Sequence, residues 1–376
     1  MEEPSFTIGV EEEYLLIDRQ TRNLAADPPH EFMEACEKRL GKAVSPEFLR
    51  CQVEIGTPVC QSTAEAGQAL ARLRGTIAEV ARDYDLAPLA VSTHPFADWD
   101  ALLHTDRKRY NDLAADLQVV ARRLMICGMH VHVAIEDEAA RIDILNQLAY
   151  FIPHLLALST SSPFWRGKKT GLKSYRLAVF DEMPRTGLPE AFDSPGHYHR
   201  TVDTLVQAGV IEDATKIWWD LRPSGRFPTL EMRVMDVCTR LEDALAVASL
   251  MRCVTRMLYR LRRNNQRWRK YSNFLIRENR WLAQRHGASG SLIDFGKGER
   301  VPYKDLIDEI LELIEPDAEF FGCRATVEHA RAIAAEGTSA DRQLARYAAE
   351  TDAGVDHDEA LRRVVDQIAE ETLQGT

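Results

Sequence analysis

The sequence lacks the features that mark several large classes of protein. Its 376 residues carry 47 Lys and Arg against 58 Asp and Glu, for a formal charge of −11. No basic surplus is therefore available to bind nucleic acid. No apolar run approaches the roughly 20 residues of a membrane-spanning helix, and the acidic N-terminal MEEPSFTIG has no signal-peptide character. We expect a soluble, cytoplasmic protein with neither a nucleic-acid nor a membrane partner.

Common cysteine and nucleotide motifs are also absent. The seven cysteines are scattered and never spaced as CxxC, which favours free thiols over a disulfide framework or a zinc site. There is no GxxxxGK[ST], HExxH or GxSxG, and GASGSL and GKGER lack the spacing and setting of GxGxxG. A nucleotide bound by this chain would have to be held through metal ions and arginines.

Strand and helix patterns alternate over the first two thirds of the chain. Alternating apolar residues predict strands over 6–17, 48–59, 86–93, 128–135, 216–224 and 229–237. Helical spacing predicts helices over 62–84, 107–125, 138–160 with an interruption at Pro153, and most of the chain after Leu241 except 287–298. This order indicates an α+β or mixed α/β protein.

Three consecutive glutamates interrupt the first predicted strand. Side chains two residues apart on a strand share a face, so Glu11 and Glu13 project together whereas Glu12 points the other way. Two carboxylates on one face, with Cα atoms roughly 6–7 Å apart, need a positive group beside them, and a divalent cation is the simplest candidate. The alternative is a solvent-exposed face on which both carboxylates are merely hydrated.

Three further strands carry polar groups on one face and apolar groups on the other. These polar residues are Glu54, with Glu47 upstream, then His130 and His132, and then Glu231 and Arg233. Together they predict a sheet with one face packed on helices and the other forming a carboxylate-lined trough. Oxygen ligands with one or two imidazoles and no thiolate suit Mg²⁺ or Mn²⁺, and magnesium held in this way typically serves a nucleoside triphosphate.

Six segments occur in an order typical of one family. They are GVEEEY, VEIGTPVC, STHPFADW, GMHVHVAI, SSPFWRGKKTGLKSYR and WWDLRPSGRFPTLEMRVMD. Over about residues 5–265 the chain resembles the type 2 glutamate–cysteine ligase family, in particular its bacterial carboxylate–amine ligase branch. The resemblance implies a glutamine-synthetase-like α+β fold, with a curved, mainly antiparallel sheet whose open face binds Mg-ATP. We expect a single catalytic domain, 1–376, in which 266–376 form a mostly helical C-terminal extension.

The resemblance also implies a reaction. The γ-carboxylate of glutamate would attack ATP to give an acyl phosphate and ADP, and an amine, typically that of cysteine, would then displace phosphate to form a γ-glutamyl amide. Branch members resemble glutamate–cysteine ligases less in the amine pocket than in the ATP half, so we expect weak glutamate–cysteine ligation and a preference for another acid or amine. The partners would be these small molecules, and a homo-oligomer is left open.

Site roles follow from the resemblance residue by residue. The metal ligands would be Glu11, Glu13, Glu47, Glu54, His130 and Glu231, with Glu11 and Glu13 on different ions, Glu54 and Glu47 completing the first ion, and His130 and Glu231 the second. Arg233, Arg222 and His132 would bind the nucleotide, with Arg233 on the transferring phosphate. Arg176, with Arg222, would clamp a substrate carboxylate or phosphate, a task that suits the bidentate guanidinium. The residues with catalytic roles would be Arg233, Glu231 and Arg176.

Several alternatives stay open at this point. Glu47 could be a surface residue and Arg176 a structural ion-pair partner, and His94 could either fix a loop or contact substrate. Trp218 and Trp219 fit a core or a pocket wall better than chemistry. The same trough would also serve a metal-dependent hydrolase of amides or phosphates that needs no ATP, or a non-catalytic nucleotide-binding protein.

Overall fold

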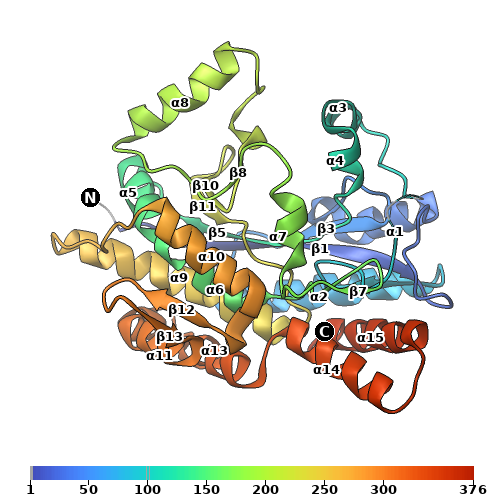
Figure 1. Ribbon diagram of the computed structural model, residues 1–376. Coiled ribbons are helices and arrows are strands. Elements are labelled where there is room, and N and C mark those ends of the chain that lie inside the picture. The colour runs from blue at the N-terminus through green and yellow to red at the C-terminus, as the bar shows by residue number, and fades with distance from the viewer. Residues whose placement is uncertain (1–2, 99, 101) are drawn as a thin grey trace.

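A seven-stranded sheet forms the centre of the molecule (Figure 1). The computed structural model describes residues 3–98, 100 and 102–376. The strands run β10–β11–β5–β1–β3–β2, and β4 pairs with β1 beside this path. Every pairing within the sheet is antiparallel. The bounds are β1 Ile8–Asp18, β2 Val44–Pro46, β3 Gln52–Gly56, β4 Leu86–Leu89, β5 Met129–Ala134, β10 Leu221–Pro223 and β11 Thr229–Met232.

The register of the sheet determines which side chains become neighbours. On one side of the central strand β1, Glu11 lies opposite His130 of β5. On its other side, Glu13 lies opposite Glu54 of β3. One strand further, His132 lies opposite Glu231 of β11. Directly opposed residues share a face of a sheet, so polar side chains from four strands meet on one face.

Two long helices cover the opposite face. Helix α2 (Thr63–Arg82) begins at Ser62, whose side chain accepts a hydrogen bond from the backbone N–H of Glu65, as expected of an N-cap. Helix α9 (Leu241–Arg263) packs against α2 and β5. In the view of Figure 1 both helices run beneath the sheet, whereas α8, α3 and α4 rise above it. The polar face therefore lies between these upper helices.

The remaining elements of the first two thirds are short. The helices are α1 His30–Leu40, α3 Lys108–Leu117, α4 Val119–Arg122, α5 Glu138–Leu148, α6 Ile152–Ser159, α7 Tyr175–Phe180 and α8 Pro195–Gln207. Two-residue strands form at β6 Phe164–Trp165, β7 Lys168–Lys169, β8 Thr186–Gly187 and β9 Trp218–Trp219. The predicted helix over 107–125 was wrong as one element, because Gln118 adopts a positive φ of 50° that ends α3 before α4 begins.

The C-terminal third is helical, as predicted, and shares its core with the sheet. Its elements are α10 Asn273–His286, β12 Ser291–Asp294, β13 Glu299–Pro302, α11 Tyr303–Leu313, α12 Glu315–Phe320, α13 Arg324–Glu336, α14 Ser339–Asp352 and α15 His357–Thr372. The break expected at 287–298 is mostly the first strand and the turn of the hairpin β12–β13. One continuous cluster of buried apolar side chains runs from Phe6 to Ile368. The single catalytic domain nevertheless stays a prediction.

The predicted fold class is confirmed: the protein is α+β, with an antiparallel central sheet and a helical C-terminal region. Within the described residues, no helix combines the length and apolar character needed to cross a membrane. All seven cysteines are free and buried. Trp99, which ends the STHPFADW segment, lies outside the described residues.

Candidate active site

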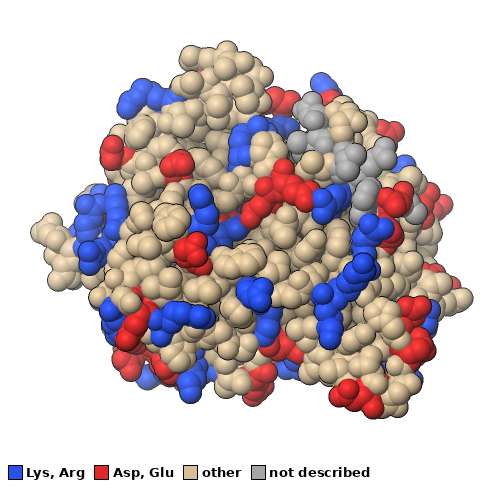
Figure 2. All heavy atoms as spheres, viewed as in Figure 1, with Lys and Arg blue, Asp and Glu red and all other residues tan. Residues whose placement is uncertain are grey.

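A cavity of about 460 Å³ lies over the polar face of the sheet. Figure 2, which views the molecule from the side, shows acidic and basic side chains next to one another near the middle of the visible surface. The cavity is lined by all of the predicted site residues, namely Glu11, Glu13, Glu47, Glu54, His130, His132, Arg176, Arg222, Glu231 and Arg233. The structure thus brings together every side chain for which the sequence predicted a role.

Three carboxylates gather at one end of the cavity. Glu13, Glu47 and Glu54 each offer an oxygen within 4.8 Å of the other two. Glu13 Oε2 accepts a hydrogen bond from the backbone N–H of Gly128 at 2.7 Å, and Glu54 Oε2 accepts one from Ser45 Oγ at 3.0 Å. Burial raises the pKa of Glu54 well above its usual range, and the neighbouring carboxylates of Glu47, Glu11 and Glu13 raise it further. A cation here would replace this repulsion by attraction.

Two imidazoles face the carboxylates of β1. His132 Nε2 lies 3.6 Å from Glu11 Oε1, and His130 Nε2 lies 3.9 Å from Glu13 Oε1. Both Nε2 atoms are buried and have no hydrogen-bond partner within the part of the chain that the structure describes. Burial acts to raise the pKa of Glu11, but the 3.3 Å hydrogen bond with His130 Nδ1 and the proximity of both imidazoles hold it well below its usual range. Buried nitrogens without partners are uncommon, and a shared cation would satisfy them.

The donor set fits divalent metal ions. Ligand atoms at about 2.1 Å from a magnesium ion lie roughly 3.0–4.2 Å from one another, which matches the nitrogen–oxygen separations just described. Three overlapping groups have their ligand atoms within 4.8 Å of one another: Glu13 with Glu47 and Glu54, Glu11 with Glu54 and His130, and Glu11 with His132 and Glu231. Glu47 therefore lies with Glu13 and Glu54 among the potential metal ligands. Sequence reasoning placed His132 with the nucleotide, whereas the geometry also places it among potential metal ligands.

Two arginines hold the carboxylate of Glu231. Arg222 donates to it from Nε at 2.9 Å and from Nη2 at 3.1 Å, and Arg233 Nη1 donates to its Oε1. Burial would raise the pKa of Glu231, yet the charges of Arg233 and Arg222 keep it well below its usual range. Both oxygens are thus already bonded, so a metal ion would have to share Glu231 with the arginines. Its role as a ligand stays a prediction.

The three predicted arginines differ in what they can offer a substrate. Arg222 Nη1 donates to the backbone carbonyls of Thr215 and Ile217, so its donors are directed at the protein. Arg233 reaches Glu231 and lies 3.4 Å from His130 Nδ1, but its buried Nε has no partner among the described residues. Arg233 therefore has donor capacity left for a phosphate oxygen.

Arg176 is buried at the edge of the cavity. Its Nη1 donates to the carbonyl of Val234 at 3.3 Å, and its Nη2 donates to that of Arg233 at 3.2 Å. Burial lowers the pKa of this guanidinium. In this state Arg176 supports the segment that carries Arg233, and its predicted role as a substrate clamp stays a prediction.

Sequence reasoning missed part of the cavity wall. Gln52, Lys216 and Arg226 also line it, as does Phe227, whose ring lies edge-on to His132 with centroids 6.3 Å apart. An exposed aromatic residue in the GRFP turn between two site strands was the available signal. Trp218 forms part of the wall, as expected.

Two residues that the sequence analysis discussed, His94 and Glu12, lie outside the cavity. His94 is buried and fixes a loop, because its Nε2 bonds the carbonyl of Arg22 and its Nδ1 accepts from the amides of Phe96 and Ala97. Glu12 lies under the sheet, where it pairs with the fully buried Arg74 at 2.6 Å. The three glutamates thus divide between the cavity and the core.

The family model of glutamate-cysteine ligase family 2 (GCS2) matches residues 7–367. The chain belongs to this family. A protein of Rhodospirillum rubrum named "Putative glutamate--cysteine ligase 2" is 61% identical over 377 residues, covering 99% of this chain and 97% of the relative. A protein of Jannaschia sp. with the same name is 56% identical over 366 residues, covering 97% and 96%. The predicted family is therefore confirmed, and the chain is an enzyme of a ligase family.

Solved structures share the fold of this family member. A glutamate–cysteine ligase of Francisella tularensis in complex with AMP superposes with a TM-score of 0.69 at 14% identity, over 98% of this chain and 89% of that one. A bifunctional glutathione synthetase of Pasteurella multocida gives a TM-score of 0.70 at 13% identity. That match covers 97% of this chain, which spans about half, 52%, of the larger protein.

Proposed function

We propose that the protein is an ATP- and Mg²⁺-dependent carboxylate–amine ligase that joins glutamate, or a similar acid, to cysteine or a related amine. The γ-carboxylate would be activated as an acyl phosphate, with release of ADP and then of phosphate. One observation carries the proposal: carboxylates and unpartnered imidazole nitrogens from neighbouring strands converge beside arginines in one cavity. We place the reaction in the cytoplasm, whose reducing conditions suit seven free cysteines.

The charges of the cavity suit a phosphoryl transfer from a nucleotide. Glu11, Glu13 and Glu54 would hold divalent ions, which supply Lewis-acid stabilisation of phosphate oxygens when bound. Arg233 would place its free donor capacity on the transferring phosphate, where charge develops in the transition state. Family membership makes an adenine nucleotide the expected co-substrate, and the Francisella tularensis ligase is described in complex with AMP.

The cavity walls bear on the choice of substrates. Phe48, Leu124 and Ile126 form an apolar part of the cavity lining, and Lys216 and Arg226 form a basic part of it. The apolar wall is suited to the side chain of the amine, and the basic side to an anionic group. The residues that line the cavity do not identify a single amine, so the amine substrate is to be identified by testing a panel of amines.

The test is ADP release by the purified protein with Mg²⁺, ATP, glutamate and a panel of amino acids and amines, with the product identified by mass. We expect ADP release to require both an acid and an amine. Glu13→Gln and Arg233→Ala should abolish turnover while retaining the circular dichroism of the folded protein. Glu34→Gln, on the exposed side of α1, is the matched control and should be fully active.

Other outcomes would contradict the proposal. Full activity of Glu13→Gln or of Arg233→Ala would contradict the assignment of this cavity as the active site. Cleavage of γ-glutamyl amides without any nucleotide would identify a metal-dependent hydrolase instead. Tight ATP binding without turnover of any acid and amine pair would indicate a non-catalytic nucleotide-binding protein.

A further inference from the structure

Two cysteines that the proposed reaction does not use lie side by side behind the sheet. Cys253 of α9 and Cys323, which immediately precedes α13, are 70 residues apart in the chain, yet their Sγ atoms are 3.6 Å apart. Both are free and buried. A disulfide has an S–S separation of about 2.05 Å, so the two sulfur atoms would have to approach each other by about 1.5 Å to form one.

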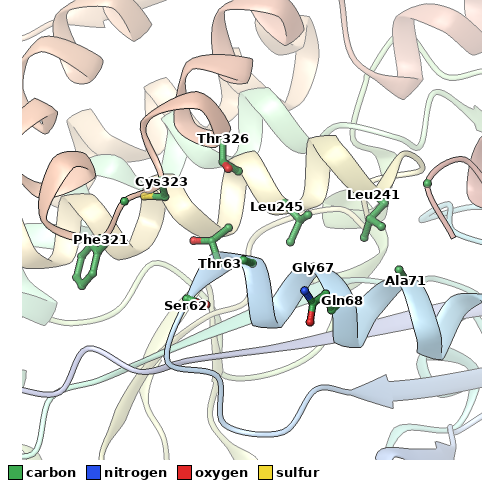
Figure 3. Close-up of a pocket in the computed structure, with 13 residues that line it drawn as sticks. Ser62, Thr63, Gly67, Gln68, Ala71, Leu241, Leu245, Phe321, Cys323 and Thr326 are labelled. Carbon is green, nitrogen blue, oxygen red and sulfur yellow. The ribbon is translucent and has the colours of Figure 1, made fainter.

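A separate cavity reaches one of the two thiols. It has a volume of about 410 Å³ and lies between the first half of α2 and the turn that joins α12 to α13. Figure 3 shows Cys323 and Phe321 at one end of this cavity, Leu241 at the other and Thr63 of α2 beneath. Cys323 lines the cavity but Cys253 does not. A small molecule that enters the cavity therefore meets Cys323 first.

The surroundings of the pair distinguish the two sulfurs. Arg252 is buried beside them, with its guanidinium 3.9 Å from the centre of the Phe321 ring. Its Nη1 has no hydrogen-bond partner in the described part of the chain, whereas its Nε and Nη2 donate to the backbone carbonyls of Phe6 and Gln61. The hydrogen bond from Cys253 and the charge of Arg252 lower the pKa of Cys323, while the same hydrogen bond and burial raise that of Cys253.

We infer that Cys253 and Cys323 form a dithiol modification site, in which Cys323 reacts with a small disulfide in the cavity and Cys253 resolves the product. Cys323, as thiolate, attacks one sulfur of RS–SR, forms a mixed disulfide and releases RS⁻, which takes up the proton that Cys323 lost. The sulfur of Cys253 then attacks that of Cys323 and displaces the second RS⁻, which takes the proton of Cys253. The two protein thiols are oxidised to one disulfide, and RS–SR is reduced to two RSH.

The new bond would join α9 to the turn between α12 and α13. Because α9 packs on the strand that carries His130 and His132, the bond would be formed on the far side of the sheet from the proposed active site. The site thus requires no participation of Mg²⁺ or nucleotide, and its test is independent of the ligase reaction.

The experiment exposes the folded full-length protein, without denaturant, to 2-hydroxyethyl disulfide and maps the products by peptide mass under non-reducing conditions. We expect wild type to form a Cys253–Cys323 crosslink that a reductant removes. Cys253→Ser should stop at a mixed disulfide on Cys323, and Cys323→Ser should leave Cys253 unmodified. Cys36→Ser, which removes a buried thiol of α1, is the control and should form the crosslink as wild type does.

Three results would overturn the inference. They are a crosslink that appears only after denaturation, a mixed disulfide that accumulates on another cysteine first, and equal labelling of Cys253 in Cys323→Ser. If a serine variant fails to fold, blocking of Cys323 by methyl methanethiosulfonate in wild type decides the same point, since the inference predicts that Cys323 is blocked before any other thiol.

Discussion

The guanidinium of Arg176 lies directly over the α-carbon of Gly128, where any side chain would collide with it. A Cβ built on Gly128 would come within 2.8 Å of Arg176 Cζ. The same glycine donates its backbone N–H to Glu13 Oε2 at 2.7 Å. One residue of the GMHVH segment thus positions both a predicted metal ligand and the arginine that supports the backbone of Arg233.

Gly128→Ala should therefore damage the site from beneath. The added methyl group has to displace either Arg176 or the Gly128 amide bonded to Glu13, and overpacking of this kind typically costs about 1–3 kcal/mol. We expect a large fall in kcat, read as ADP release, and a lower midpoint in urea. Gly75→Ala, in α2, is the control: a Cβ there makes an ordinary 3.7 Å contact with Cβ of Thr376, and alanine stabilises a helix interior by about 0.5–1 kcal/mol over glycine.

Although Glu12 and Glu13 are adjacent, Glu12→Gln should lower the stability of the fold, whereas Glu13→Gln should lower the activity. Glu12 is fully buried and bonded by Arg74 from Nε at 2.9 Å and Nη2 at 2.6 Å. Removal of one partner of a buried ion pair costs about 3–5 kcal/mol, so Glu12→Gln should unfold at much lower urea while its folded fraction keeps its kcat. Glu13→Gln should lose turnover with little change in the urea midpoint. Equal stability of the two variants would contradict the division of the strand between core and site.

Much of the fold and of the candidate site could be predicted from local sequence patterns. The period-two alternation around Glu11 and Glu13 assigned them to one face, because that inference needs only strand geometry. Partners distant in the chain could not be predicted in the same way. Arg74 is 62 residues from Glu12, and no pattern in either segment predicts that the two residues pair. The pairing of Glu231 with Arg222 depends on hairpin register, which sequence periodicity does not determine.

Glu54→Gln should make the metal-free protein more stable. Glu54 lies among Glu11, Glu13 and Glu47, and burial together with their charges opposes its ionisation. A neutral amide can retain the hydrogen bond from Ser45 Oγ, so in EDTA at pH 7 we expect a gain of about 1 kcal/mol in the free energy of unfolding, as is common when a functional site is relieved of repulsion.

In the presence of Mg²⁺, wild type should become more stable than Glu54→Gln. A ligand at 100 times its Kd stabilises the state that binds it by about 2.7 kcal/mol, and the wild-type carboxylates should receive this benefit more fully than Glu54→Gln. The measurement is thermal unfolding against Mg²⁺ concentration, with Glu34→Gln expected to follow wild type. An identical response of Glu54→Gln and wild type would exclude Glu54 from the ion site.

Acid should destabilise the fold through two buried histidines. Burial lowers the pKa of His94 and of His154 to about 4 each. His94 is held neutral by geometry, since its Nδ1 accepts hydrogen bonds from two backbone amides. The unfolded chain, with histidine pKa values near 6.5, binds more protons than the folded chain below that pH, so stability is retained above pH 6.5 and falls as the pH drops towards 4.

The size of this effect can be isolated with one substitution. Between pH 7 and pH 5 each such histidine should cost about 2 kcal/mol of unfolding free energy. His94→Gln can still accept from the amides and donate to the carbonyl of Arg22, and it does not titrate. At pH 7 His94→Gln should be less stable than wild type. Between pH 7 and pH 5 its free energy of unfolding, measured by urea titration at both pH values, should fall by about 2 kcal/mol less than that of wild type. His30→Gln, on an exposed side chain, should lose as much as wild type does; if His94→Gln did so too, His94 would not be held neutral by the fold.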